Sequence, residues 1–276
     1  MNPHRRINGQ PGDRIAADDR GLSYGDGLFE TVWVHEHQAP LWPRHMARLA
    51  EGCRRLDLPL PDPDWLWQET LLVVADLACA VVRITWTRGG GPRGYATPVQ
   101  VQPTCIVSAA SHTPWPADWY HHGIRMHVCR TRLASQPALA GIKHLNRLEQ
   151  VLARREWQDP TVGEGLMLDF DDRVISATAA NMFALVDGRL HTPALDRCGV
   201  AGTARARLLD DCPDAVETDM TLDTLLAADA VFITSAVRGI VPVCELAGRI
   251  WPPSAQVAQI QTAWRDAGLP PGQVSA

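Results

Sequence analysis

The chain has 276 residues, of which 46% are apolar and 21% are charged, and its formal net charge is −5. This length suffices for one large domain or for two modest ones with proper cores. Acidic and basic residues are interspersed, and the lack of a basic tract argues against a nucleic-acid partner. No run of about 18 apolar residues occurs, so no membrane span is expected.

The first residues and the cysteines indicate the compartment. The segment "MNPHRRINGQ" carries charge but no apolar core, so it is not a secretory signal. Seven cysteines, an odd number without a C-x-x-C pair, indicate reduced thiols and argue against a zinc site. The adjacent His121 and His122 are interpreted as a solvated loop rather than as metal ligands. We therefore expect a cytoplasmic protein without a metal.

The first part of the chain alternates between strand and helix patterns. The expected elements are a hairpin over 27–42, helices over 43–58 and 62–78, and strands over 80–89 and 100–110. The first helix begins at Pro43 and places Met46, Leu49, Cys53 and Leu56 on one face. The Gly- and Pro-rich segment 89–98 separates the two strands. Strands and helices therefore mix within this part.

A Pro-rich segment, Ser111–Gly123, interrupts the pattern and divides the chain into parts of similar size. We predict domains at 1–112 and 123–276 joined by a linker at 113–122. Expected elements of the second part are strands over 123–132, 164–171, 173–186, 189–193 and 230–243, and helices over 201–212, over 254–268 and after Lys143. The last of these helices has a mostly apolar face made of Leu145, Leu148, Val151, Leu152 and Arg155. The pattern predicts an α+β fold, a mixed α/β arrangement in two domains.

Lys143 is the only lysine in a chain with 26 basic residues. Arginine stays protonated in proteins, whereas an amine can lose its proton, attack a carbonyl to form a Schiff base, or accept a proton from carbon. The neighbouring apolar Ile142 and Leu145 would partly bury the amine, and burial lowers the pKa of an amine. The count therefore favours a catalytic lysine, and the alternative is a solvated residue retained by chance.

A Schiff-base lysine suggests pyridoxal phosphate, which also needs a phosphate cradle. The segment "GVAGTARARLL" offers one, since Gly202, Thr203 and Ala204 would open a helix whose free N–H groups point at an anion. An ordinary glycine turn before a surface helix is the alternative.

The segment "LAGIKHLNRLEQVL", 139–152, resembles the lysine segment of the 4-amino-4-deoxychorismate lyase family. These are fold-type IV pyridoxal-phosphate enzymes related to branched-chain and D-amino-acid transaminases. Further similar motifs, in chain order, are "LSYGDGLFETV", "HMARL", "RGGGPRGYAT", "ATAANMFAL", "GVAGTAR" and "FITSAVRGIVPV". The resemblance covers nearly the whole chain, and the lysine segment and the R-G-Y loop favour the lyase branch.

The resemblance implies a two-domain architecture similar to D-amino-acid aminotransferase, a homodimer, and roles for individual residues. Lys143 would bond to the cofactor aldehyde and Arg48 would bind the phosphate through its guanidinium fork. The remaining cofactor contacts would come from Ser176, Asn181, Gly202, Thr203, Ala204 and Ser235, with Ala236 standing where relatives often have a hydroxyl. Thr31, a candidate catalytic residue, would line the substrate pocket with Tyr95, and Arg93 would meet a substrate carboxylate. Strand packing and loop solvation are the alternatives for these three residues.

One position departs from the family pattern. Relatives carry a glutamate five residues before the Asn of "AANMF", where it protonates the pyridine nitrogen, and this chain has Ser176 there. A hydroxyl leaves the cofactor a weaker electron sink, which transaminases need more than the lyase, because elimination of pyruvate yields an aromatic ring. The substitution favours elimination over transamination.

The resemblance thus implies a lyase that converts 4-amino-4-deoxychorismate, a small molecule, into 4-aminobenzoate and pyruvate on the route to folate. In that reaction Lys143 would act as base and then as acid. The alternatives are a fold-type IV aminotransferase for D- or branched-chain amino acids, and a non-catalytic homologue that binds the cofactor or a carboxylate. Ser176 is the feature that favours the last.

Overall fold

The computed structural model describes residues 4–270. It divides into two compact units, Met1–Thr113 with Ile142–Asn146, and Pro114–Gly141 with Arg147–Ala276. Two features differ from the predicted division. The segment around Lys143 packs with the first unit, and part of the expected linker 113–122 forms helix α4 (Ala117–His121).

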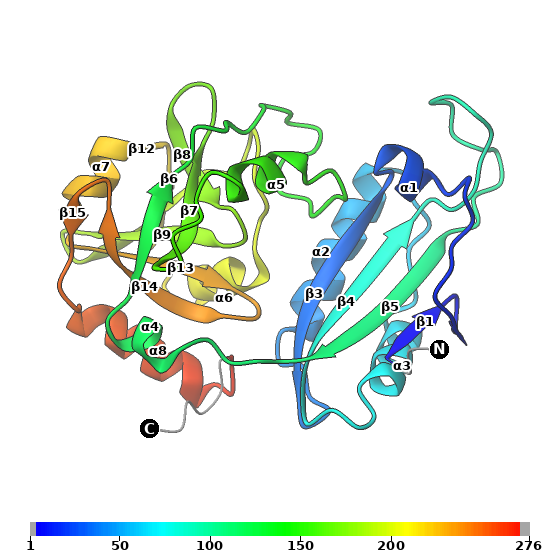
Figure 1. Ribbon diagram of the computed structural model, residues 1–276, viewed down its shortest axis with the longest axis horizontal. Coiled ribbons are helices and arrows are strands. Elements are labelled where there is room, and N and C mark those ends of the chain that lie inside the picture. The colour runs from blue at the N-terminus through cyan, green and yellow to red at the C-terminus, as the bar shows by residue number, and fades with distance from the viewer. Residues whose placement is uncertain (1–3, 271–276) are drawn as a thin grey trace. The chain divides into compact units, whose positions relative to one another are not determined.

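Within residues 4–113 the first unit holds a five-stranded antiparallel sheet in the order β2-β1-β5-β4-β3. Its elements are β1 (Arg5–Ile7), β2 (Gln10–Pro11), α1 (Arg20–Tyr24), β3 (Gly27–His35), α2 (Trp42–Arg55), α3 (Pro63–Val73), β4 (Cys79–Thr87) and β5 (Thr104–Ser111). Helix α2 packs on β3, and α3 packs on β5 and β1, which covers one face of the sheet (Figure 1).

The hairpin expected over 27–42 is wrong. Strand β3 is correct, but its partner is β4, which follows only after α2 and α3. The turn after β3 is closed by a single bridge between His35 and Gln38, and α2 begins at once. Local alternation specifies a strand but not which strand pairs with it.

Helix α2 has the predicted bounds within a few residues, and its buried side chains include the expected Met46, Leu49 and Cys53. Its sequence supports the helix because a Pro lies in the first turn and two arginines lie in the last. Gly52 permits a close approach to β3, since a Cβ there would lie 2.7 Å from Leu28 Cδ1. This approach brings α2 against the strand that bears Glu30.

Within the described part of the second unit lies a ten-stranded mixed sheet with the path β11-β10-β9-β13-β14-β6-β7-β8-β12, and β15 pairs with β14. Its strands are β6 (Ile124–Val128), β7 (Val162–Leu168), β8 (Arg173–Ala177), β9 (Asn181–Val186), β10 (Arg189–Pro193), β11 (Val216–Thr218), β12 (Met220–Thr221), β13 (Ala230–Ser235), β14 (Gly239–Leu246) and β15 (Arg249–Ile250). Strand β6 runs parallel to β7 and β14. Strand β8 also contacts β9 and β10, so the sheet curls on itself as in a barrel. The α+β fold class is confirmed.

The helices of this unit are α4, α5 (Leu148–Arg154), α6 (Thr203–Asp211), α7 (Leu222–Ala227) and α8 (Ala255–Asp266). Helix α8 packs on β14 and α6 on β13 (Figure 1). The main core contains apolar side chains from β6, β7, β9, β13 and β14. Trp251 closes it at one end, where its Nε1 donates to Ala228 O over 2.8 Å.

The helix predicted after Lys143 is present, but it is shorter than expected and its apolar side chains are not buried. Helix α5 starts only at Leu148, and the side chains of Leu148, Val151 and Leu152 are exposed. The buried member is Ala153, which packs in a small cluster with Trp157 and Met167. The helix starts late because the residues before it lie extended along β3.

Candidate functional site

Lys143 lies in a short extended segment that pairs with the edge strand of the first sheet. Phe29 N donates to Lys143 O over 3.0 Å, and Leu145 N donates to Gly27 O over 3.0 Å. The Lys143 side chain is half-buried, and its Nζ lies 4.4 Å from the centre of the Phe29 ring. An ammonium over an aromatic face is attracted by the ring quadrupole. The sheet edge therefore holds the amine in a defined, partly apolar place.

Behind Phe29, on the face of β3 that α2 covers, Glu30 forms a buried cluster with two residues of α2. Glu30 Oε1 accepts from Arg48 Nε over 2.8 Å. Glu30 Oε2 accepts from His45 Nδ1 over 2.6 Å and also from Arg48 Nη2. The side chains of Glu30 and His45 are each 1% exposed, and that of Arg48 is 11% exposed. The predicted phosphate-binding arginine is thus held in orientation by a bidentate carboxylate.

The charges in this cluster are set by its burial and its pairing. Burial alone would raise the pKa of Glu30, but the charge and hydrogen bonds of Arg48, together with His45, lower this pKa to about 2. Burial lowers the pKa of His45, an effect that Glu30 opposes and that Arg48 and Lys143 reinforce. Burial therefore disfavours the protonated form of His45, whose Nδ1 faces the Glu30 carboxylate.

Thr31 follows on β3 opposite Arg83 of β4, with Phe29 two residues before it on the same face. The guanidinium carbon of Arg83 lies 4.0 Å from the centre of the Phe29 ring, so two cationic groups, those of Arg83 and Lys143, contact one ring. The sequence reasoning missed Arg83. A signal was present in the sequence, because Arg83 is the lone charged residue in the strand-like run "AVVRITW".

In the second unit, the predicted phosphate turn opens helix α6. Gly202 is the N-cap residue and provides no side-chain cap, and Ala206 N donates to Gly202 O over 2.9 Å. A Cβ at Gly202 would lie 2.0 Å from Asn181 Oδ1, so a side chain has no room there. The Thr203 hydroxyl is buried and has no hydrogen-bond partner among the described residues. These groups form a cradle of N–H and O–H donors.

Two further predicted residues, Asn181 and Ser235, lie on the neighbouring strands β9 and β13. Asn181, at the start of β9, donates from Nδ2 to Val200 O over 2.9 Å and so holds the turn in place. Gly141, two residues before Lys143 in the chain, pairs with the same turn, because Ala201 N donates to its carbonyl over 2.9 Å. Ser235 ends β13, the strand that pairs with β9, and its hydroxyl accepts from Arg238 N over 3.2 Å. Asn181 and Ser235 therefore have structural partners within this unit.

Ser176 lies on β8 opposite Met167 of β7 and is buried. A nearby carboxylate that the sequence reasoning missed is Glu164 of β7, which is 2% exposed. It pairs with Arg238 over 2.6 Å and accepts from the Thr178 hydroxyl and from Gly165 N. The charge of Glu164 is therefore paired with that of Arg238.

Arg93 and Tyr95 lie in the loop of residues 88–103, between β4 and β5. Tyr95 is 87% exposed, and its ring lies 5.5 Å from that of Tyr24. Among the described residues the Arg93 side chain makes no hydrogen bond or ion pair, which leaves its guanidinium available for a ligand.

Other reactive groups are few in the part of the chain that the structure describes. The cysteines are all thiols, and burial raises the pKa of Cys53, Cys105 and Cys129 to about 12. No group of three or more His, Cys, Asp or Glu side chains within residues 4–270 could hold a metal ion. No helix in this range has the length and apolar character needed to cross a membrane.

Comparison with known proteins places these parts in a family. The model of the amino-transferase class IV family matches residues 27–246. The chain belongs to that family. A class IV relative, aminodeoxychorismate lyase from Vibrio harveyi, is 34% identical over 245 residues, which are 86% of this chain and 89% of the relative. D-alanine aminotransferase from Listeria innocua is 27% identical over 247 residues, which are 85% of this chain and 83% of that relative.

Among solved structures, 4-amino-4-deoxychorismate lyase from Pseudomonas aeruginosa superimposes with a TM-score of 0.90 at 43% identity. The match covers 95% of this chain and 98% of that one. The resemblance to the lyase branch of the class IV family, inferred from the lysine segment and the R-G-Y loop, is confirmed.

Proposed function

We propose that this protein is a pyridoxal-phosphate-dependent lyase that converts 4-amino-4-deoxychorismate into 4-aminobenzoate and pyruvate, a step towards folate. The observation that carries the proposal is the chain's single amine side chain, Lys143, in a segment paired with the β3 edge. The 43% identity to a lyase of known structure over 95% of the chain supports the same reaction.

The residues present fit pyridoxal phosphate. Helix α6 starts without a side-chain cap, and the buried Thr203 hydroxyl has no partner among the described residues, and both features suit a phosphate. Arg48 would add a cationic contact, and Lys143 would hold the aldehyde carbon covalently. When bound, the cofactor supplies an electron sink for charge that develops at the carbon bearing the substrate's amino group.

Lys143 moves the proton in this reaction. Its amine takes the proton from the ring carbon that bears the substrate nitrogen, and returns it to the methylene carbon of the departing pyruvyl group. One C–H and one C–O bond break and one C–H bond forms, so the substrate divides into two products without water, oxidant or second substrate. A neutral amine is required at the first step, and an amine, unlike a guanidinium, can lose its proton.

The lyase reaction also suits Ser176. A buried hydroxyl at this position, with Glu164 already paired to Arg238, offers the pyridine nitrogen no negative partner. The sink is weaker than with a carboxylate, and formation of an aromatic product compensates for this in elimination but not in amino transfer.

We further propose that the protein works as a cytoplasmic homodimer. The dimer is inferred from the family resemblance, and the exposed apolar side chains of α5 give it a candidate contact surface on the second unit. Leu148, Val151 and Leu152 are each more than half exposed, which is costly for three neighbouring apolar side chains in water.

The proposed function predicts the products of the purified holoenzyme. With 4-amino-4-deoxychorismate as substrate, the enzyme should release 4-aminobenzoate and pyruvate in a ratio of one to one. Fluorescence measures the 4-aminobenzoate, and a coupled reductase assay measures the pyruvate. Amino transfer from D-alanine or leucine to a keto acid should be far slower. Faster amino transfer would favour an aminotransferase instead, and a colourless protein that cannot be reconstituted with cofactor would favour a non-catalytic homologue.

Ser176→Glu tests the link between the ring partner and the reaction type. A carboxylate beside a protonated ring nitrogen raises the pKa of that nitrogen by about 1–3 units. We expect amino transfer to rise about tenfold or more relative to elimination. The absorbance of the bound cofactor should also respond to pH over a shifted range.

The control is Ser176→Gln, which has nearly the same volume as Glu without its charge. It should reproduce any packing disturbance at this buried position but neither the spectral shift nor the change in reaction ratio. Equal behaviour of the Glu and Gln variants would show that charge at 176 does not select the reaction.

A further inference from the structure

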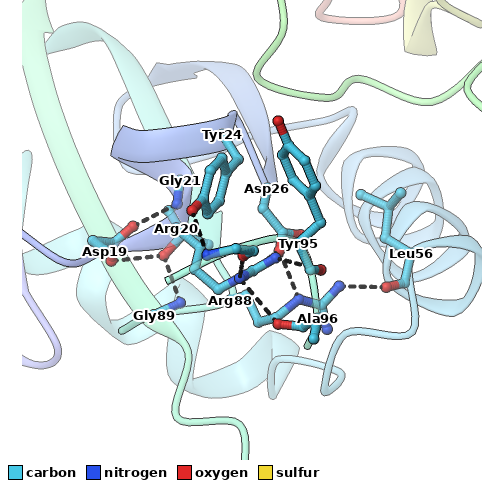
Figure 2. A network of polar contacts seen from close by, with 12 residues as sticks. Asp19, Arg20, Gly21, Tyr24, Asp26, Leu56, Arg88, Gly89, Tyr95 and Ala96 are labelled. Carbon is cyan, nitrogen blue, oxygen red and sulfur yellow. Dashed lines mark hydrogen bonds and ion pairs between the residues drawn. The ribbon is translucent and has the colours of Figure 1, made fainter. Parts of the chain in front are cut away.

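The loop that carries Arg93 and Tyr95 is held by a buried arginine of α1. Arg20 is 4% exposed, and its guanidinium uses all three nitrogens (Figure 2). Nε donates to Asp26 over 2.9 Å, Nη1 to Gly94 O over 3.0 Å and to Ala96 O over 3.2 Å, and Nη2 to Tyr95 O over 3.2 Å. Three successive carbonyls of the loop therefore converge on one cation.

The backbone of the loop is shaped for this contact. Gly94 has φ +95°, and no atom lies within 4 Å of where its Cβ would be. This left-handed conformation is open to glycine without strain. Such a turn lets the carbonyls on both sides of Tyr95 point to the same group.

Two other contacts join α1 to the same loop. Gly94 N donates to the Tyr24 hydroxyl over 3.1 Å, and the rings of Tyr24 and Tyr95 are paired. At the base of the loop, Arg20 N donates to Gly89 O over 2.8 Å. Helix α1 thus contacts both the base and the tip of the loop, while Arg93 itself points to no protein partner among the described residues.

A second arginine, Arg88 at the start of the loop, shares the carboxylate, but its side chain donates outside the loop. Arg88 Nε donates to the same Asp26 oxygen over 2.8 Å, and its Nη atoms donate to Asp57 O and Leu56 O at the end of α2. The side chains of Arg20 and Arg88 are each 5% exposed. The two arginines therefore have the same partner and burial, and differ in the backbone that they hold.

We propose that Arg20 is a positioning residue that fixes the Arg93–Tyr95 segment in its ligand-binding conformation, and that α1 thereby sets the affinity for the substrate's carboxylate. This rests on the proposed function for the nature of the ligand and for the role of Arg93 in binding it. A guanidinium fork satisfies several carbonyls at fixed angles, which a lysine ammonium does not. Arg20→Lys therefore keeps the charge and removes most of the contacts to the loop.

The experiment compares Arg20→Lys with Arg88→Lys in the holoenzyme. Trypsin cleavage after Arg93, followed by mass spectrometry, and amide exchange in 91–98 report on the loop directly. We expect Arg20→Lys to accelerate both about tenfold or more and to raise KM by a similar factor, with kcat changed less than about threefold. Arg88→Lys should leave cleavage, exchange and KM near the wild-type values.

Tyr24→Phe gives a graded second test, because it removes only the hydroxyl that accepts from Gly94 N and its side chain is partly exposed. It should accelerate cleavage and exchange in the loop as Arg20→Lys does, but to a smaller extent.

Unchanged cleavage and exchange in Arg20→Lys, or equal effects of both arginine variants, would overturn the anchoring role. A loosened loop with unchanged KM would overturn the positioning role. A wild-type enzyme without elimination activity would refute the proposed function, while the loop measurements still decide the anchoring.

Discussion

Replacing Lys143 by Arg should abolish the release of 4-aminobenzoate and leave the fold intact. The positive charge and the contact with the Phe29 ring are retained, because a guanidinium also stacks on an aromatic face. A guanidinium can neither bond to an aldehyde nor give up its proton. Loss of the proton transfer alone should slow turnover by about 10²–10⁴. The cofactor absorbance at the edge of the visible range should disappear as well.

The composition makes this test unusually clear. Since Lys143 is the only lysine, borohydride treatment of the wild-type holoenzyme should leave the pyridoxyl group on the peptide containing residue 143. Arg249→Lys, which adds a second amine on exposed β15, serves as the control and should leave both labelling and activity unchanged. Turnover by Lys143→Arg within tenfold of the wild-type rate would exclude the assigned role.

The sequence predicted the elements of this site better than their partners. The count of lysines singled out Lys143, and the apolar spacing of α2 placed Met46, Leu49 and Cys53 correctly. The pairing of residues 142–146 with the edge of β3 was missed, as it joins segments more than a hundred residues apart. The hairpin was wrong because β3 pairs with β4, which follows only after α2 and α3.

The buried charge pairs were also beyond local patterns. Glu164 and Arg238 are 74 residues apart, and Arg88 and Asp26 are 62 apart, so no spacing rule relates them. Motif resemblance identified Arg48 but not its partner Glu30, although the two lie in adjacent motifs. Long-range pairing of strands decides such contacts. The roles assigned from motifs to residues of both units are predictions.

Glu30→Gln should produce the largest loss of stability among the changes considered. The substitution leaves the guanidinium of Arg48, 11% exposed, without its carboxylate. Breaking a buried ion pair by removing one partner costs about 3–5 kcal/mol. The unfolding midpoint of the chain should therefore fall by roughly 6–20 °C. Thermal unfolding followed by tryptophan fluorescence measures the change.

A surface pair provides the comparison. Arg207 and Asp211 are four residues apart on α6, with side chains 35% and 41% exposed. Asp211→Asn should cost only about 0.3–0.5 kcal/mol. Comparable losses in the two variants would mean that the Glu30 cluster contributes no more than an ordinary surface pair. The Glu30 variant should also retain cofactor less well, since Arg48 loses the group that orients it.

The pH dependence of the same variant gives an independent check on the sign of the effect. The pKa of Glu30 is about 2 in the folded chain against an ordinary 4.5, because Arg48 and His45 outweigh burial. A carboxyl with a lowered pKa stabilises the fold fully above pH 4.5, and this stabilisation, about 3 kcal/mol, is lost as the pH falls towards 2.

Other carboxylates, such as Glu156, titrate in the same range, so acid unfolding of the wild type alone does not isolate Glu30. The difference between wild type and Glu30→Gln does, and it should be large at pH 7 and shrink steadily between pH 4.5 and 2. A difference that stays constant over this range would show that the loss arises from packing and not from the charge of Glu30.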